Sequence, residues 1–110
     1  MNIKMTNIAE KFLCLTADIA QGEGLQVMID GYPPLAVFHL EDGGFYVTDD
    51  TCTHGDASLA DGEIDGCEVE CPFHAGAFDI KTGEPCGAPC SIPLKTYQSI
   101  VREGKVYLVE

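Results

Sequence analysis

The sequence has no long apolar run and few basic residues. No segment of the 110 residues approaches the roughly eighteen consecutive apolar residues of a membrane span, so none is expected. Six Lys and Arg stand against eighteen Asp and Glu, which gives a formal charge of −12. This charge opposes binding to nucleic acid or to an anionic membrane, and it favours a positively charged protein partner.

An export signal and a catalytic constellation are also missing. The N-terminal stretch MNIKMTNIAEKFLCL has no apolar core followed by a small-residue cleavage site, so we expect a cytoplasmic protein. In a reducing compartment, metal binding is a better use of the six cysteines than disulfides. The length predicts a single domain, residues 1–110, without room for a catalytic domain. We therefore expect no enzyme, and nothing suggests more than a monomer.

The pattern that is present is one of short strands and glycine-containing turns. Twelve Gly, six Pro and the lack of any ten-residue helical periodicity are typical of a small all-β domain. We predict an antiparallel β-sandwich, with one helical turn at residues 16–20 that has Thr16 as its N-cap. The predicted strands are residues 12–15, 25–29, 35–40, 45–48, two short strands within 62–70, then 77–80, 97–102 and 105–109.

Two short segments each carry one cysteine and one histidine. Cys52-Thr53-His54 is followed, after sixteen residues, by Cys71-Pro72-Phe73-His74. A [2Fe–2S] cluster with two thiolates on one iron and two imidazoles on the other needs these four ligands, and this ligand set defines a Rieske centre. The spacing thus predicts one cluster per chain. A zinc site would use the same four atoms, although zinc sites more often pair cysteine with cysteine. Buried cysteines with incidental histidines are the third interpretation.

The run CTHGDASLADGEIDGCEVECPFHAGAFDIKTGEP resembles the cluster-binding region of Rieske ferredoxins, in particular those of bacterial aromatic-ring-hydroxylating dioxygenase systems. The resemblance covers the chain from residue 12 to 109. It implies a Rieske fold with the cluster on two loops at one end, in a subdomain of about residues 50–90. It also implies that Cys52 and Cys71 bind the inner iron, and that His54 and His74 bind the outer iron through Nδ1.

The resemblance is to the low-potential members of the family. High-potential Rieske proteins carry an extra cysteine in each ligand loop, where this chain has Asp56 or its neighbour and Phe73. They also carry a serine and a tyrosine where this chain has Gly76 and Phe78. Fewer hydrogen-bond donors to the sulfurs stabilise the added electron less, so we expect a reduction potential near about −150 mV.

These features predict a soluble one-electron carrier. It would take electrons from a flavin-dependent, NAD(P)H-oxidising ferredoxin reductase and pass them to a terminal Rieske non-haem iron oxygenase that hydroxylates an aromatic compound. The alternative is a Rieske small subunit of a nitrite reductase-type complex.

Several residues near the motif have secondary interpretations. Pro72 and Phe73 are predicted to form an apolar rim for a docking partner, and His39 is predicted to be structural. The segment 87–89 resembles the proline-containing loop that covers the cluster. The remaining cysteines are expected to be small buried hydrophobes; they are Cys14, Cys67, Cys86 and Cys90.

Overall fold

The computed structural model describes residues 9–73, 76–88 and 90–110, and nearly every regular element in them is a β-strand. Alternation of apolar and polar residues between turns accounts for these short strands. The strands are β1 (Glu10–Leu15), β2 (Glu23–Val27), β3 (Leu35–His39), β4 (Phe45–Asp49), β5 (Ile64–Asp65), β6 (Glu68–Glu70), β7 (Ala77–Asp79), β8 (Pro85–Gly87), β9 (Thr96–Tyr97), β10 (Ser99–Arg102) and β11 (Lys105–Val109).

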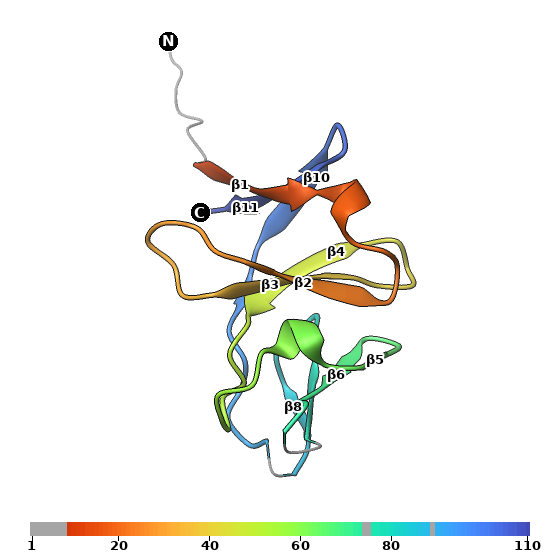
Figure 1. The fold of residues 1–110 in the computed structure, drawn as a ribbon, viewed down its shortest axis with the longest axis vertical. Coiled ribbons are helices and arrows are strands. Elements are labelled where there is room, and N and C mark those ends of the chain that lie inside the picture. Colours follow the sequence, from red (N-terminus) through yellow and green to blue (C-terminus); the bar gives the residue numbers. More distant parts are fainter. Residues whose placement is uncertain (1–8, 74–75, 89) are drawn as a thin grey trace.

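The strands form three antiparallel sheets that follow one another along the molecule (Figure 1). Their orders are β1-β11-β10, β2-β3-β4-β9 and β5-β6-β7-β8. The first two sheets enclose one core. Its buried residues are Leu13, Cys14, Ile19, Val27, Leu35, Val37, Val47, Val106 and Leu108.

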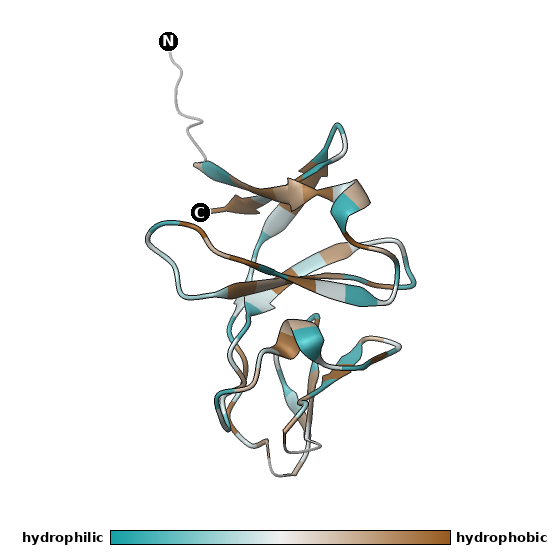
Figure 2. Cartoon of the chain, in the orientation of Figure 1, coloured by the Kyte–Doolittle hydropathy of each residue, from teal (hydrophilic) through white to brown (hydrophobic). Residues whose placement is uncertain are grey.

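Strand β3 is buried on both faces. Leu35 and Val37 contribute to the core between the first two sheets, whereas Ala36 and Phe38 contribute to a second core below. All four are 0 % exposed. Hydrophobic colouring on β3 and β11 is visible in Figure 2. Side chains alternate across a strand, so β3 is the wall that the two cores share.

The second core connects the middle sheet to the third one. It contains Leu59 of the short 3-10 helix η2 (Leu59–Asp61), Val69 of β6, Phe78 of β7 and the two cysteines of the predicted ligand set. The two short strands predicted within 62–70 are present as the hairpin β5–β6, and Gly66 adopts the left-handed φ of 64° that its turn requires. The ligand loops are therefore attached to a packed base.

The predicted all-β antiparallel class is confirmed, with local corrections. Thr16 is not an N-cap, because it is the first residue of the 3-10 helix η1 (Thr16–Asp18) and the cap is Leu15, whose N–H donates to Asp18 Oδ2 at 2.9 Å. The predicted strand 97–102 is two strands, since β9 pairs with β4 and β10 pairs with β11. Strand β8 was not predicted. The domain boundaries 1–110 and about 50–90 stay predictions.

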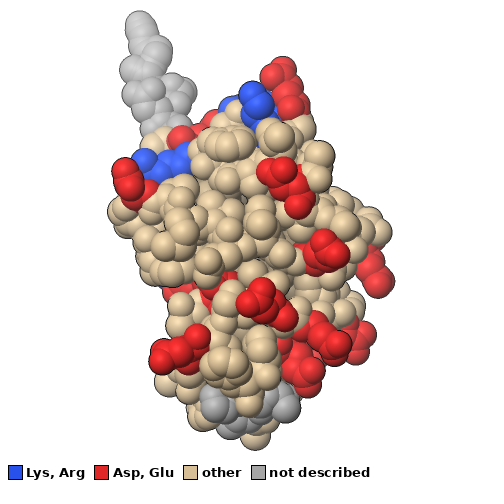
Figure 3. Space-filling model, viewed as in Figure 1, with Lys and Arg blue, Asp and Glu red and all other residues tan. Residues whose placement is uncertain are grey.

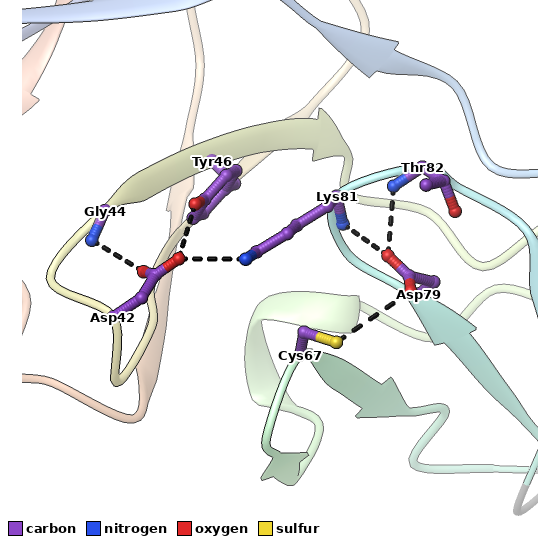
Figure 4. A network of polar contacts seen from close by, with 7 residues as sticks. All are labelled: Asp42, Gly44, Tyr46, Cys67, Asp79, Lys81 and Thr82. Atoms are coloured by element: carbon purple, nitrogen blue, oxygen red, sulfur yellow. Dashed lines mark hydrogen bonds and ion pairs between the residues drawn. The ribbon is translucent and has the colours of Figure 1, made fainter.

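A polar network joins the third sheet to the turn between β3 and β4 (Figure 4). Asp42 accepts hydrogen bonds from Gly44 N and Tyr46 Oη, and it pairs with Lys81 Nζ at 2.9 Å. These contacts hold the pKa of Asp42 well below its ordinary value of 3.8, and the contact with Lys81 has the largest effect. The ion pair therefore stabilises the fold at pH values above 3.8, and this stabilisation is lost as the pH falls toward the lowered pKa of Asp42. Its exposure to solvent keeps this contribution small.

No helix among the described residues is long and apolar enough to cross a membrane.

Candidate metal centre

The first predicted ligand loop leaves the end of β4 and closes on itself. Cys52 N donates to Ala57 O at 3.0 Å, and Gly55 N donates to Cys52 O at 3.2 Å. Cys52 is 3 % exposed, whereas His54 on the same loop is exposed. The backbone N–H of His54 also donates to Cys52 Sγ at 3.4 Å. The loop therefore turns its thiol inward and its histidine outward.

A buried aspartate fixes the base of this loop. Asp50 is 1 % exposed, and its carboxylate accepts hydrogen bonds from Gln26 Nε2 at 2.7 Å, Ser58 Oγ at 2.9 Å and Ala60 N at 2.9 Å. Its carbonyl accepts from Leu59 N at 2.7 Å. One carboxylate thus ties β2 to both the end of the ligand loop and η2. Asp50 was not predicted from the sequence, because it looks like an ordinary loop acid until its partners converge on it.

The second predicted ligand loop begins directly after β6. Cys71 is 1 % exposed and its N–H donates to Gly76 O at 2.7 Å, which closes the loop. Pro72 and Phe73 lie at the surface, and Phe73 is 68 % exposed. The fourth predicted ligand, His74, lies outside the described residues.

The structure brings the two predicted ligand thiols together. Cys52 and Cys71 belong to one buried cluster, and the Cys71 thiol lies close enough to act electrostatically on that of Cys52. Burial raises the pKa of the Cys52 thiol to about 11; the His54 N–H acts against this and the Cys71 thiol adds to it. A thiol must lose its proton to bind iron, so the metal itself has to favour the thiolate here.

The donors fit one half of the predicted cluster well. Two buried thiols side by side suit a single iron that takes two thiolates, and an exposed imidazole on the same loop suits the other iron. Within the described ranges no three His, Cys, Asp or Glu side chains are gathered as a metal site. The ligand assignment of Cys52, His54, Cys71 and His74 therefore stays a proposal.

A third loop closes over the same region. Thr53 Oγ1 donates to Ile92 O at 2.8 Å, which ties the first ligand loop to this segment. Cys90 N donates to Gly87 O at 3.1 Å, and Cys90 is only 5 % exposed. The proline of the segment predicted to cover the cluster, Pro89, lies outside the described residues.

The other predicted residues have mixed outcomes. Cys14 is a buried hydrophobe, as expected, and burial raises its pKa to about 11. Cys86 is exposed, which corrects the expectation of burial, because it lies on the edge strand β8. Cys67 is half-buried, 3.8 Å from Asp79 Oδ2. His39 stacks on the Phe45 ring and its Nδ1 lies 2.9 Å from Ile19 O, which agrees with a structural role.

Together, the three antiparallel sheets and the two thiol-bearing loops define a small β protein built to hold a cluster at one end. The Rieske [2Fe-2S] domain family matches residues 9–98, and the chain belongs to that family. The cofactor is accordingly a [2Fe–2S] cluster.

Relatives and a solved structure resemble most of the chain. Ferredoxin CarAc of Metapseudomonas resinovorans is 47 % identical over 87 % of this chain and 89 % of its own length. The ferredoxin component of the p-cumate 2,3-dioxygenase system of Pseudomonas putida is 44 % identical over 94 % of each chain. The ferredoxin in a complex of reduced oxygenase and oxidised ferredoxin, from carbazole 1,9a-dioxygenase, has a TM-score of 0.84 at 45 % identity and covers 91 % of this chain and 92 % of its own.

Proposed function

We propose that this protein is the ferredoxin component of an aromatic-ring dioxygenase system and carries single electrons to a terminal oxygenase. The observation that carries the proposal is the pair of buried, adjacent thiols on two loops of a Rieske domain. Relatives of 44 % identity or more that are named as ferredoxins, one of them within a dioxygenase system, support it. The bound cluster would supply the capacity to hold one electron.

The residues divide this task between them. Cys52 and Cys71 would anchor the cluster from inside, where their burial keeps water away from the sulfurs. His54 and His74 would bind the outer iron, and the exposed loop position of His54 allows a docked partner to come close. Phe78, buried in the core, and Gly76 offer no hydroxyl to the cluster, which supports a low potential.

The charge of the cluster-binding end favours a basic partner. Residues 50–90 carry nine of the eighteen acids and one of the six bases. Four of these acids, Glu63, Asp65, Glu68 and Glu70, line a hollow beside β5 and β6. In the view of Figure 3, separate acidic groups are scattered over the face shown, down to its lower part, while the blue of Lys and Arg is confined to the β1, β10 and β11 end. Docking would therefore be fastest at low salt.

Reconstitution tests the function directly. Product formation by an aromatic-ring oxygenase, supplied with NADH and a flavin-dependent reductase but no ferredoxin of its own, should depend on added protein. Turnover should rise in proportion to ferredoxin until the oxygenase saturates. Saturating ferredoxin that yields no product, although the reductase reduces it, would contradict the oxygenase partnership. If the protein instead supported nitrite reduction within a sirohaem enzyme, the small-subunit alternative would hold.

The exposed ring of Phe73 offers a separate test of the docking surface. Together with Pro72 it borders a groove of about 360 Å³ that reaches Cys71 and is flanked by Asp61, Glu63 and Glu70. Buried aromatic anchors contribute most of the binding energy at small interfaces. We expect Phe73→Ser to raise the KM of the oxygenase for this ferredoxin by about 3- to 30-fold with an unchanged cluster spectrum.

Val101→Ser is the matched control for Phe73→Ser. Val101 is also an exposed apolar residue, 50 % exposed, but it lies on β10 in the sheet farthest from the ligand loops. It should leave KM unchanged. Equal effects of the two substitutions would show that the docking surface is elsewhere. The cytoplasmic location, the monomeric state and the reductase partner stay predictions.

A further inference from the structure

Two exposed apolar side chains lie on the loops at the cluster-binding end of the molecule. Phe73 of the second ligand loop is 68 % exposed, and Ile92, on the segment that follows β8, is 60 % exposed. The Phe73 ring borders the groove already described. A single exposed apolar residue is common on protein surfaces. What distinguishes Ile92 is how its backbone is held and what surrounds it.

The backbone at Ile92 is tied to the first ligand loop. Thr53 Oγ1 donates to Ile92 O at 2.8 Å, and Thr53 directly precedes His54, one of the proposed ligands. In Figure 1 the light-blue segment after β8 runs beside the yellow-green loop after β4. Even an interface that buries only about 600 Å² of each partner is about 28 Å across, far wider than the spacing of neighbouring residues. A partner that docks over His54 therefore also covers Ile92.

Buried neighbours on both sides hold this segment in place. Leu94 is 3 % exposed, and its N–H donates to Gly83 O at 2.8 Å. A Cβ at Gly83 would lie 2.0 Å from Leu94 O, so the two backbones are in direct contact. On the other side, Cys90 is 5 % exposed, and its N–H donates to Gly87 O at 3.1 Å. Ile92 is thus exposed between two anchored residues, and a partner that binds it has little loop to order.

The surroundings of Ile92 carry no charge, in contrast to the β5–β6 side of the same end. The ten residues from Pro85 to Leu94 include no Asp, Glu, Lys or Arg. Residues 61–70 include five acids and no base, and four of these acids line the hollow beside β5 and β6. A partner that fits both sides is apolar opposite Ile92 and basic opposite the acids.

We propose that Ile92 is an apolar docking residue for the terminal oxygenase. The choice of partner follows from continuity, because Ile92 and the groove beside Phe73 flank the same two ligand loops, where the proposed electron transfer takes place. Burial of an apolar side chain contributes to affinity, whereas charges at the rim contribute mainly to the rate of association. This inference rests on the proposed function and extends its docking surface to the neutral side of the molecule.

Ile92→Ser tests the proposal through the KM of the oxygenase for the holoprotein. Loss of the buried apolar contact should raise this KM about 3- to 10-fold, with kcat, the cluster spectrum and the midpoint potential unchanged. Ile92→Leu keeps an apolar side chain of the same size and should stay within about twofold of the wild type. Met28→Ser is the matched control, because Met28 is 65 % exposed but lies directly after β2 in the middle sheet. It should leave KM unchanged.

Salt separates an apolar contact from a charged one. Screening weakens charge pairs, so the KM of the wild type should rise with ionic strength. The ratio of the Ile92→Ser KM to the wild-type KM should instead agree within about twofold at roughly 50 and 300 mM salt. A ratio that falls to one at the higher salt concentration would show that the substitution acts through the charges, and the proposal would be wrong.

Calorimetric titration of the oxygenase with oxidised ferredoxin measures the contact without turnover. Burial of apolar surface makes the heat-capacity change of binding negative. Ile92→Ser should therefore bind with a less negative heat-capacity change and with a Kd about 3- to 10-fold higher than that of the wild type. Met28→Ser should match the wild type in both quantities.

The remaining outcomes decide between partners. A KM and a Kd of Ile92→Ser equal to those of the wild type, or an equal rise in Met28→Ser, would overturn the proposal. So would a rise in the KM of the reductase without any change for the oxygenase, because Ile92 would then serve the other partner. If Ile92→Ser fails to hold its cluster, Ile92→Ala decides by the same comparison. Wild-type protein that carries no electrons to the oxygenase would instead refute the proposed function.

Discussion

Cys71→Ser should give a protein that keeps its β-sheets and loses its cluster. Cys71 is 1 % exposed and lies in the same buried cluster as Cys52, directly after β6. Serine presents a hydroxyl that deprotonates far less readily than a thiol and is a poorer ligand for an iron–sulfur centre. We expect iron content below about one tenth of the wild type, no visible absorption band and no electron paramagnetic resonance signal after reduction.

The control for this substitution is Cys67→Ser. Cys67 lies four residues earlier, in the turn between β5 and β6, half-buried with its thiol 3.8 Å from Asp79 Oδ2, and it is not one of the predicted ligands. The Cys67→Ser variant should retain iron and the wild-type spectrum. Full iron content with an unaltered spectrum in Cys71→Ser, or loss of the cluster in Cys67→Ser with an intact fold, would refute the ligand assignment.

Asp50→Ala should destabilise the fold markedly. It would leave three donors, Gln26 Nε2, Ser58 Oγ and Ala60 N, without their acceptor in a position that is 1 % exposed. Each buried donor without an acceptor costs about 1 to 3 kcal/mol before the surrounding structure relaxes. Water can reach some of them, so we expect a loss of about 2 to 4 kcal/mol in the free energy of unfolding, measured by urea denaturation.

The same substitution should loosen the first ligand loop, because Asp50 lies two residues before Cys52. The matched control is Asp56→Ala, which removes an exposed carboxylate from the same loop. It should change the free energy of unfolding by less than about 0.5 kcal/mol. An Asp50→Ala protein as stable as the Asp56→Ala protein would show that the buried hydrogen bonds contribute nothing net.

The cluster chemistry and most strands could be predicted from the sequence, because both depend on local spacing. A thiol and an imidazole two or three residues apart on each of two loops already indicate a mixed ligand set, and β11 was predicted with the bounds 105–109. The break at Gln98 was missed because residues 97–102 contain no Gly or Pro to interrupt a strand, while the pairing of β9 with β4 depends on a distant strand.

The role of Asp50 could not be predicted, for a different reason. The partners of Asp50 are up to 24 residues away in sequence. Nothing local distinguishes a buried acceptor from an ordinary loop acid. Such residues are recognised only after the loops have been placed against one another.

Strand β3 also constrains how this sequence can vary over evolutionary time. Its four residues from Leu35 to Phe38 have no face toward solvent, because successive side chains enter different cores. A substitution at any of them must suit its own core without moving the backbone, since a displaced backbone disturbs the packing on the opposite side as well. Compensating changes should therefore occur in pairs that join distant parts of the chain, such as Val37 with β11 and Phe38 with the neighbourhood of η2.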